Sequence, residues 1–176
     1  MPMSYVCDMD GVIHHGSRLI PGALEFVQRL QSRGHKFLFL TNNSQWTPRD
    51  LKHKLEQMGI SVDETAFHTS ALATAEFLGR QKPGGTAYVI GGAGLTHALY
   101  SVGFTLTENN PDYVVVGETR SYDYETTTKN AAKTPQINKR NRLPLSALRC
   151  HRDRLFTTIL APFLAVVTKR SSARSG

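Results

Sequence analysis

The sequence has few cysteines and no long apolar segment, and each shortage excludes a class of protein. Cys7 and Cys150 are its two cysteines among 176 residues. Their spacing predicts neither a disulfide framework nor a zinc site. The longest apolar run, Leu155–Val167, contains Pro162 and is shorter than the roughly 20 residues of a membrane-spanning helix. The first residues lack the pattern of a secretory signal peptide. We therefore expect a soluble, cytoplasmic protein without a membrane partner, in which Cys7 is a small core residue.

Acidic residues are scarce in the last third of the chain. Residues 1–125 carry 10 of the 21 Lys and Arg residues and 13 of the 14 Asp and Glu residues, a net charge of 10 − 13 = −3. Residues 126–176 carry the other 11 basic residues and one acid, Asp153, a net charge of 11 − 1 = +10. Regular hydrophobic periodicity is lost at the same place. We therefore expect residues 126–176 to be a basic tail of uncertain structure, translated partly out of frame.

Strand and helix patterns alternate over the first two thirds of the chain. Short apolar runs typical of buried strands are Tyr5–Cys7, Lys36–Leu40, Thr86–Ile90 and Tyr113–Val116. Segments with apolar residues at helical spacing are Pro21–Arg33, Thr47–Gly59, Ser70–Leu78 and Leu95–Val102. This alternation predicts an α/β fold with parallel strands and right-handed crossovers.

Capping residues predict where the helices begin. Pro21 suits the first position of the first helix. Thr47 and Asp50 have the spacing of a capping box at the start of the second. Ser70 is the expected cap of the third helix.

Two carboxylates stand one residue apart directly after the first predicted strand. Asp8 and Asp10 lie on the same side of an extended chain, because side chains i and i+2 do so. Gly11 follows them and lets the backbone turn sharply near a ligand. The polar segment Thr41–Asn43 follows the second predicted strand. Since ligands bind outside the carboxyl ends of the strands in open α/β sheets, we expect both loops to line one site.

The residue types in these two loops suit phosphoryl chemistry. One carboxylate can act as a nucleophile and the other as an acid or base. Carboxylates also hold hard cations such as Mg²⁺, which prefers oxygen ligands. The hydroxyl of Thr41 and the backbone N–H groups beside it suit phosphate oxygens.

These residues resemble those of a known family. Asp8–Ile13 (DMDGVI) is similar to the first motif of the haloacid dehalogenase (HAD) superfamily, and Phe39–Asn43 (FLTNN) to its second motif in the NagD-like phosphatases. Other similar segments are Pro21–Ala23, His68–Ala71 and Pro111–Gly117. The resemblance covers residues 4–125 and implies an α/β, HAD-like Rossmannoid parallel sheet that is incomplete. Residues 1–62 would form the N-terminal half of the core, and residues 63–125 would begin an α/β cap domain.

The resemblance also implies roles for the loop residues. Asp8 would be the nucleophile that forms an aspartyl-phosphate, and Asp10 the general acid and base. Mg²⁺ would contact the Asp8 carboxylate and the Asp10 backbone carbonyl. The implied phosphate-binding residues are Gly11, Thr41, Asn42 and Asn43. The implied substrate is a small phosphorylated metabolite, such as a nucleotide or sugar phosphate.

Two later motifs of the family are missing from the sequence. The family uses a lysine in a Gly-Lys-Pro context and a late Gly-Asp with further acids that complete the Mg²⁺ site. Asp153 lies among basic residues and matches neither pattern. Without the strands that follow the cap, the first strand would keep an open edge. We therefore expect a truncated chain that is weakly active or inactive.

Several features have competing interpretations. His14 and His15 are adjacent, but no third metal ligand accompanies them. We therefore expect a polar turn here rather than a metal site. Gly91–Gly94 lacks the full dinucleotide-binding pattern, so we expect a tight strand-to-helix turn in the cap. His151–Asp153 matches a kinase catalytic loop by coincidence. A non-catalytic fragment and a basic nucleic-acid-binding module remain alternatives, although residues 126–176 lack the aromatic platform that favours nucleic acid as a partner. The oligomeric state is not predicted.

Overall fold

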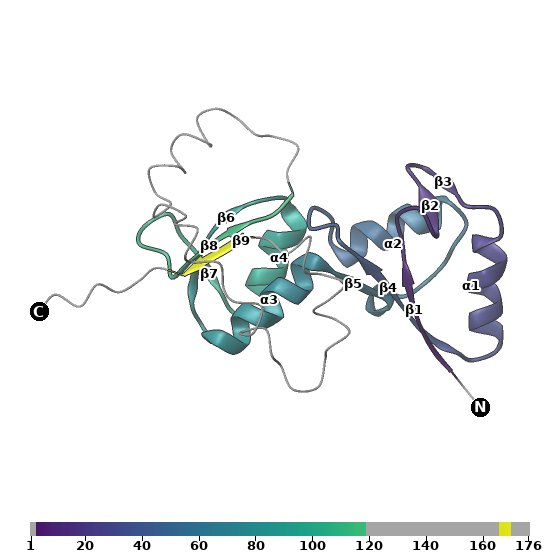
Figure 1. The fold of residues 1–176 in the computed structure, drawn as a ribbon, viewed down its shortest axis with the longest axis horizontal. Coiled ribbons are helices and arrows are strands. Elements are labelled where there is room, and N and C mark those ends of the chain that lie inside the picture. Colours follow the sequence, from purple (N-terminus) through teal and green to yellow (C-terminus); the bar gives the residue numbers. More distant parts are fainter. Residues whose placement is uncertain (1–2, 119–165, 170–176) are drawn as a thin grey trace, which may run out of the picture.

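The structure, a computed structural model, describes residues 3–118 and 166–169. Its elements form two α/β units, one built on β1, β4 and β5 and the other on β6 to β9 (Figure 1). The expectations for Cys150, Asp153 and the rest of residues 119–165 lie outside the described part of the chain. Within that part, every helix is too short or too polar to cross a bilayer.

The first unit contains a three-stranded parallel sheet in the order β1-β4-β5. Its elements in chain order are β1 (Ser4–Asp8), β2 (His14–His15), β3 (Arg18–Leu19), α1 (Ala23–Ser32), β4 (Lys36–Thr41), α2 (Pro48–Gln57), the 3₁₀ helix η1 (Glu64–Ala66) and β5 (Phe67–Thr69). Each parallel connection runs through a helix, as a crossover between parallel strands requires. The predicted α/β fold with a parallel sheet is therefore confirmed.

One face of this sheet packs on a hydrophobic core. The covered face forms a hydrophobic core from Cys7, Met9, Ile13, Ala23, Val27, Phe39, Leu51, Leu55, Ile60, Val62 and Phe67. Cys7 is buried as expected, and burial raises the pKa of its thiol. Val6 points to the opposite face and is 59% exposed. Among the described strands, β1 pairs with β4 alone.

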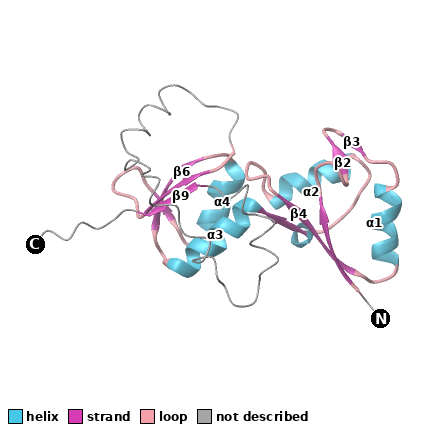
Figure 2. Cartoon of the chain, in the orientation of Figure 1, coloured by secondary structure: helices cyan, strands magenta, loops and turns pink. Residues whose placement is uncertain are grey.

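The second unit carries a four-stranded sheet in the order β7-β6-β8-β9. Its elements are α3 (Ser70–Gln81), β6 (Thr86–Ile90), α4 (Ala93–Ser101), β7 (Thr105–Leu106), β8 (Tyr113–Val116) and β9 (Val166–Lys169). β6 runs parallel to β7 and β8, whereas β9 is antiparallel to β8. Helices α3 and α4 pack side by side next to this sheet (Figure 2). Their buried residues form a second hydrophobic cluster, separate from the first.

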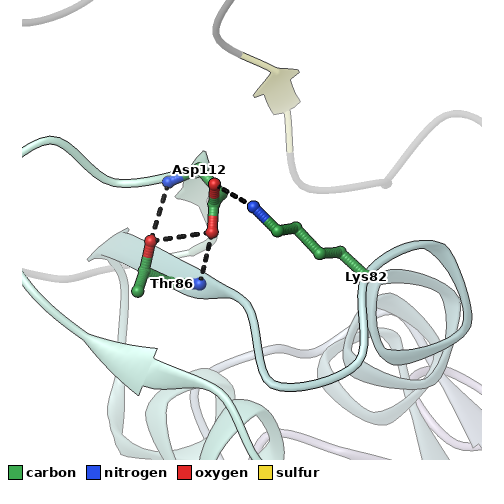
Figure 3. A network of polar contacts seen from close by, with 3 residues as sticks. All are labelled: Lys82, Thr86 and Asp112. Carbon is green, nitrogen blue, oxygen red and sulfur yellow. Dashed lines mark hydrogen bonds and ion pairs between the residues drawn. The ribbon is translucent and has the colours of Figure 1, made fainter.

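A network of polar contacts links the N-terminal ends of β6 and β8 (Figure 3). The Asp112 carboxylate accepts hydrogen bonds from the backbone N–H and the hydroxyl of Thr86, both at 2.9 Å. Its other oxygen pairs with the Lys82 ammonium. The hydrogen bond from Lys82, with those from Thr86, holds the pKa of Asp112 at about 2, below its usual value near 3.8.

Two of the predicted helix starts differ from the structure. Pro21 was expected to open the first helix, but α1 begins at Ala23, because Gly22 is the N-cap with φ 86°. Ser70 was expected to cap the third helix, but Thr69 does so by accepting from the Leu72 N–H. The capping box of α2 is confirmed, with the Thr47 hydroxyl accepting from the backbone N–H of Asp50.

The position of β5 bears on the division of the chain into domains. β5 pairs with β4, with Thr41 opposite Thr69, so residues 63–69 lie with the first sheet. The division expected after residue 62 therefore falls before the third strand of that sheet. The second unit begins with α3.

Candidate active site

Polar residues end each strand of the first sheet. Asp8 is the last residue of β1, Thr41 the last of β4 and Thr69 the last of β5. In the parallel register Asp8 lies opposite Leu40, one residue before Thr41. The sheet therefore brings the two predicted loops, Asp8–Gly11 and Thr41–Asn43, to the same carboxyl edge, where α/β sheets bind ligands.

The first loop alternates between core and solvent. Met9 and Ile13 are each 1% exposed and anchor the loop in the hydrophobic core. Asp8 and Asp10, on either side of Met9, are both exposed. The two carboxylates therefore share the solvent side of the chain, as their spacing predicts.

Backbone hydrogen bonds fix the shape of this loop. The Met9 carbonyl accepts from the N–H groups of Ile13 at 3.0 Å and His14 at 3.2 Å. The Gly11 N–H donates to the His14 carbonyl at 2.8 Å, and Gly11 has φ 81°, where a side chain would be strained. The Asp8 carboxylate accepts from the Met9 N–H at 2.8 Å. Both acids are thus presented by a tightly bonded turn.

The second loop is shaped by its own side chains. The buried Thr41 hydroxyl accepts from the Asn43 N–H at 3.2 Å. The Asn43 side-chain oxygen accepts from the N–H groups of Gln45 and Trp46, both at 2.9 Å. This oxygen is therefore engaged inside the loop. Asn42 is exposed beside it.

The second unit contacts this loop through glycines. The Gly94 N–H donates to the Gln45 carbonyl at 2.8 Å, and a Cβ on Gly94 would lie 2.5 Å from the Trp46 carbonyl oxygen. The Glu118 N–H donates to the Ser44 hydroxyl at 2.8 Å. Gly91–Gly94 spans the end of β6 and the start of α4, so the predicted tight strand-to-helix turn is confirmed. Its glycines allow close backbone contact with the loop.

His14 was expected in a polar turn, and that expectation is wrong. It belongs to the short strand β2, pairs with Leu19 of β3 and is 2% exposed. Its Nδ1 lies 3.7 Å from an Asp10 carboxylate oxygen. Burial lowers the pKa of His14, and the Lys54 charge lowers it further. A hairpin of two-residue strands has no periodicity from which this burial could have been predicted.

The residues at the first loop fit a magnesium ion in donor type. The Asp8 carboxylate and the Asp10 backbone carbonyl supply oxygen ligands, which Mg²⁺ prefers, and Mg²⁺ in proteins keeps several waters or phosphate oxygens. In residues 3–118 and 166–169, no three His, Cys, Asp or Glu side chains gather where they could hold a metal.

Comparisons with known proteins agree with this arrangement. A family model described as haloacid dehalogenase-like hydrolase matches residues 5–105. Dihydroxyacetone phosphatase from Corynebacterium glutamicum is 48% identical over 126 residues, which make up 72% of this chain and 46% of that protein. Ribonucleotide monophosphatase NagD from Escherichia coli is 45% identical over 126 residues, 72% of this chain and 50% of that protein.

A solved structure shows the same fold. NagD from Escherichia coli K-12 superposes with a TM-score of 0.68 at 44% identity, covering 75% of this chain and 53% of that one. The chain spans about half the length of the curated relatives it matches.

Proposed function

The chain belongs to the haloacid dehalogenase-like hydrolase family, in its NagD-like branch, and from this we propose that it hydrolyses phosphoric monoesters of small metabolites. The observation that carries the proposal is the pair of exposed carboxylates, Asp8 and Asp10, at the same sheet edge as the Thr41 loop. The names of the relatives, a dihydroxyacetone phosphatase and a ribonucleotide monophosphatase, support sugar or nucleotide phosphates as the substrate class.

In the proposed reaction the two carboxylates have different roles. An Asp8 oxygen attacks phosphorus and forms an aspartyl-phosphate, while the bond from phosphorus to the leaving oxygen breaks. Asp10 gives its proton to that leaving oxygen. Asp10 then takes a proton from a water molecule, whose oxygen attacks phosphorus. The bond between phosphorus and the Asp8 oxygen breaks, which frees inorganic phosphate and restores the Asp8 carboxylate.

The second loop would hold the phosphoryl group during transfer. The hydroxyl of Thr41 and the backbone N–H of Asn42 are the proposed donors to its oxygens. Gly11 would let the phosphoryl group approach the turn closely rather than donate to it, because its own N–H already donates to the His14 carbonyl. Asn43 would act by keeping the loop in shape, because its side-chain oxygen already accepts from Gln45 and Trp46.

Magnesium is the proposed cofactor, held by the Asp8 carboxylate and the Asp10 carbonyl. It would neutralise phosphate charge, so that an anionic nucleophile can meet an anionic substrate. Because the described residues supply few ligands, we expect weak binding in the absence of substrate.

The expected division of the chain stays a proposal. Residues 1–62 would be the N-terminal half of the core, residues 63–125 the beginning of a cap, and residues 126–176 a basic tail. Within the second range, β5 pairs with the core sheet, so the cap itself would begin with α3. A cytoplasmic location is proposed with it. Weak turnover is the expected result, because the sequence contains neither the lysine in a Gly-Lys-Pro context nor the late Gly-Asp that the family uses.

Phosphate release by the purified full chain tests this function. With p-nitrophenyl phosphate we expect slow release that requires Mg²⁺ and disappears in Asp8→Asn, since the amide keeps the shape of the carboxylate and loses its nucleophilicity. Glu25→Gln, a change of an exposed acid on α1, is the control and should keep the activity. No release from the folded parent chain would favour the non-catalytic fragment instead.

A further inference from the structure

We propose that His14 is a positioning residue for Asp10, donating a hydrogen bond from its Nδ1–H to one oxygen of the Asp10 carboxyl group. The inference rests on the proposed function only for its catalytic consequence. The contact itself can be tested without turnover.

The first observation is an unpaired atom in a buried place. His14 is 2% exposed, and its Nδ1 is the buried side-chain polar atom that has no hydrogen-bond partner in the described part of the chain. Buried polar atoms nearly always have a partner, because an unpaired one loses its hydrogen bonds to water. Oδ1 of Asp10 lies 3.7 Å from this nitrogen.

The backbone holds the imidazole in that place. The His14 N–H donates to the Met9 carbonyl, and its carbonyl accepts from Gly11. His14 also forms a bridge with Asp10 and pairs with Leu19 in the β2–β3 hairpin. The backbone of His14 is thus fixed and its ring is enclosed, whereas the Asp10 side chain is 59% exposed. In the proposed contact the Asp10 carboxyl group rotates and closes the 3.7 Å separation to hydrogen-bond length.

The proposed contact needs only a hydrogen on Nδ1. A neutral imidazole has one N–H and one acceptor nitrogen, whereas an imidazolium donates from both nitrogens. With the hydrogen on Nδ1, the ring donates to the carboxyl oxygen that faces it.

This contact would give the two oxygens of Asp10 separate tasks. Oδ1 would accept from His14 throughout the reaction, and Oδ2 would carry the proton that is given to the leaving oxygen and later taken from water. Holding a proton donor in one orientation is a recognised source of rate enhancement. The expected effect of His14 is therefore on kcat rather than on substrate binding.

Nitrogen NMR of the full chain with labelled histidine tests the contact directly. We expect the His14 resonance, assigned by its loss in His14→Asn, to show the tautomer with hydrogen on Nδ1. Asp10→Ala should shift this resonance, and Asp8→Asn should leave it in place. A hydrogen on Nε2 alone, or a His14 chemical shift that is the same in Asp10→Ala as in the parent chain, would overturn the proposal.

Turnover of matched variants tests the consequence. The amide nitrogen of His14→Asn lies near the position of Nδ1 and should largely keep kcat, whereas His14→Leu should lower kcat by about 10- to 100-fold with little change in KM. His53→Leu, at a histidine that is 59% exposed, is the control. Equal losses in His14→Asn and His14→Leu would show a purely structural role. If NMR shows the contact and no chain releases phosphate, the proposed function fails and the contact stands.

Discussion

At the scale of single residues, the site depends on which side chains of the first loop are buried and which face solvent. Met9 lies between two acids and is 1% exposed, so it ties the turn to the core while Asp8 and Asp10 face solvent. The same turn holds the backbone of His14, whose N–H donates to the Met9 carbonyl. A packed residue between two acids thus sets their common direction.

The network at Asp112 makes a prediction about stability and pH. A carboxyl group whose pKa is lowered from 3.8 to about 2 stabilises the fold above pH 3.8, and this contribution is lost as the pH falls toward 2. Asp112→Asn should therefore lower the unfolding free energy at neutral pH by about 1 kcal/mol, an estimate that allows for a partly exposed pair. The unfolding free energy of this variant should also fall less steeply with pH between these two values.

Thermal melting from neutral pH down to pH 2 measures this effect. Lys82→Met removes the ammonium and keeps the Thr86 hydrogen bonds, so it should reduce the pH dependence less than Asp112→Asn does. If the melting temperature of Asp112→Asn fell with pH as that of its parent does, the lowered pKa of Asp112 would be contradicted.

Residue-level prediction from the sequence succeeded where a pattern was long enough to read. The exposure of Asp8 and Asp10 follows from the alternation of buried and exposed side chains at the end of a strand. The burial of His14 could not be read in the same way, because it depends on a two-residue strand pairing with Leu19.

At the scale of elements, the turn between β6 and α4 fixes the second loop. A Cβ on Gly94 would lie 2.5 Å from a backbone oxygen of Trp46, which cannot move aside as a flexible side chain can. Gly94→Ala should therefore lower the unfolding free energy by about 1–3 kcal/mol and loosen the loop.

Gly79→Ala is the matched control for that change. Its Cβ would approach the Val102 side chain at 3.3 Å, within helix α3, where alanine is the better helix former. Urea unfolding of both variants gives the comparison. If Gly94→Ala were no less stable than Gly79→Ala, the close contact between turn and loop would not exist.

The elements that the sequence predicted are those with strong local signals. Helix α2 has a capping box and begins as expected, and β6 and β8 have the predicted bounds. The short strands β2, β3 and β7 were missed, because two residues carry no periodicity. Thr69 rather than Ser70 caps α3, because the Ser70 hydroxyl donates to the Asn42 carbonyl instead.

At the scale of the whole molecule, the described chain has two cores. One hydrophobic cluster lies between the first sheet and α1 and α2, and the other between the second sheet and α3 and α4. In the first unit, β1 is the terminal strand of the described sheet, and its Val6 is 59% exposed. The sequence indicated an unpaired edge of β1 through motifs that are missing, rather than through any residue that is present.

Separate cores predict separate responses to cavities. Leu55 and Leu99 are both fully buried, one in each cluster, and Leu→Ala at such a site costs about 2–5 kcal/mol. We expect Leu55→Ala to speed hydrogen exchange in β4 and α2, and Leu99→Ala to speed it in β6 and α4. Equal acceleration in both units by either variant would show a single cooperative core.

The central claim, that Asp8 is the nucleophile, is tested most directly by finding the phosphoryl group on it. The full chain is mixed with a phosphate monoester and Mg²⁺, quenched with acid and digested, and its peptides are weighed by mass spectrometry. The account predicts one phosphoryl group on the peptide that contains Asp8, absent in Asp8→Asn and longer-lived in Asp10→Asn. A phosphoryl group on another residue, or phosphate release that persists in Asp8→Asn, would contradict it.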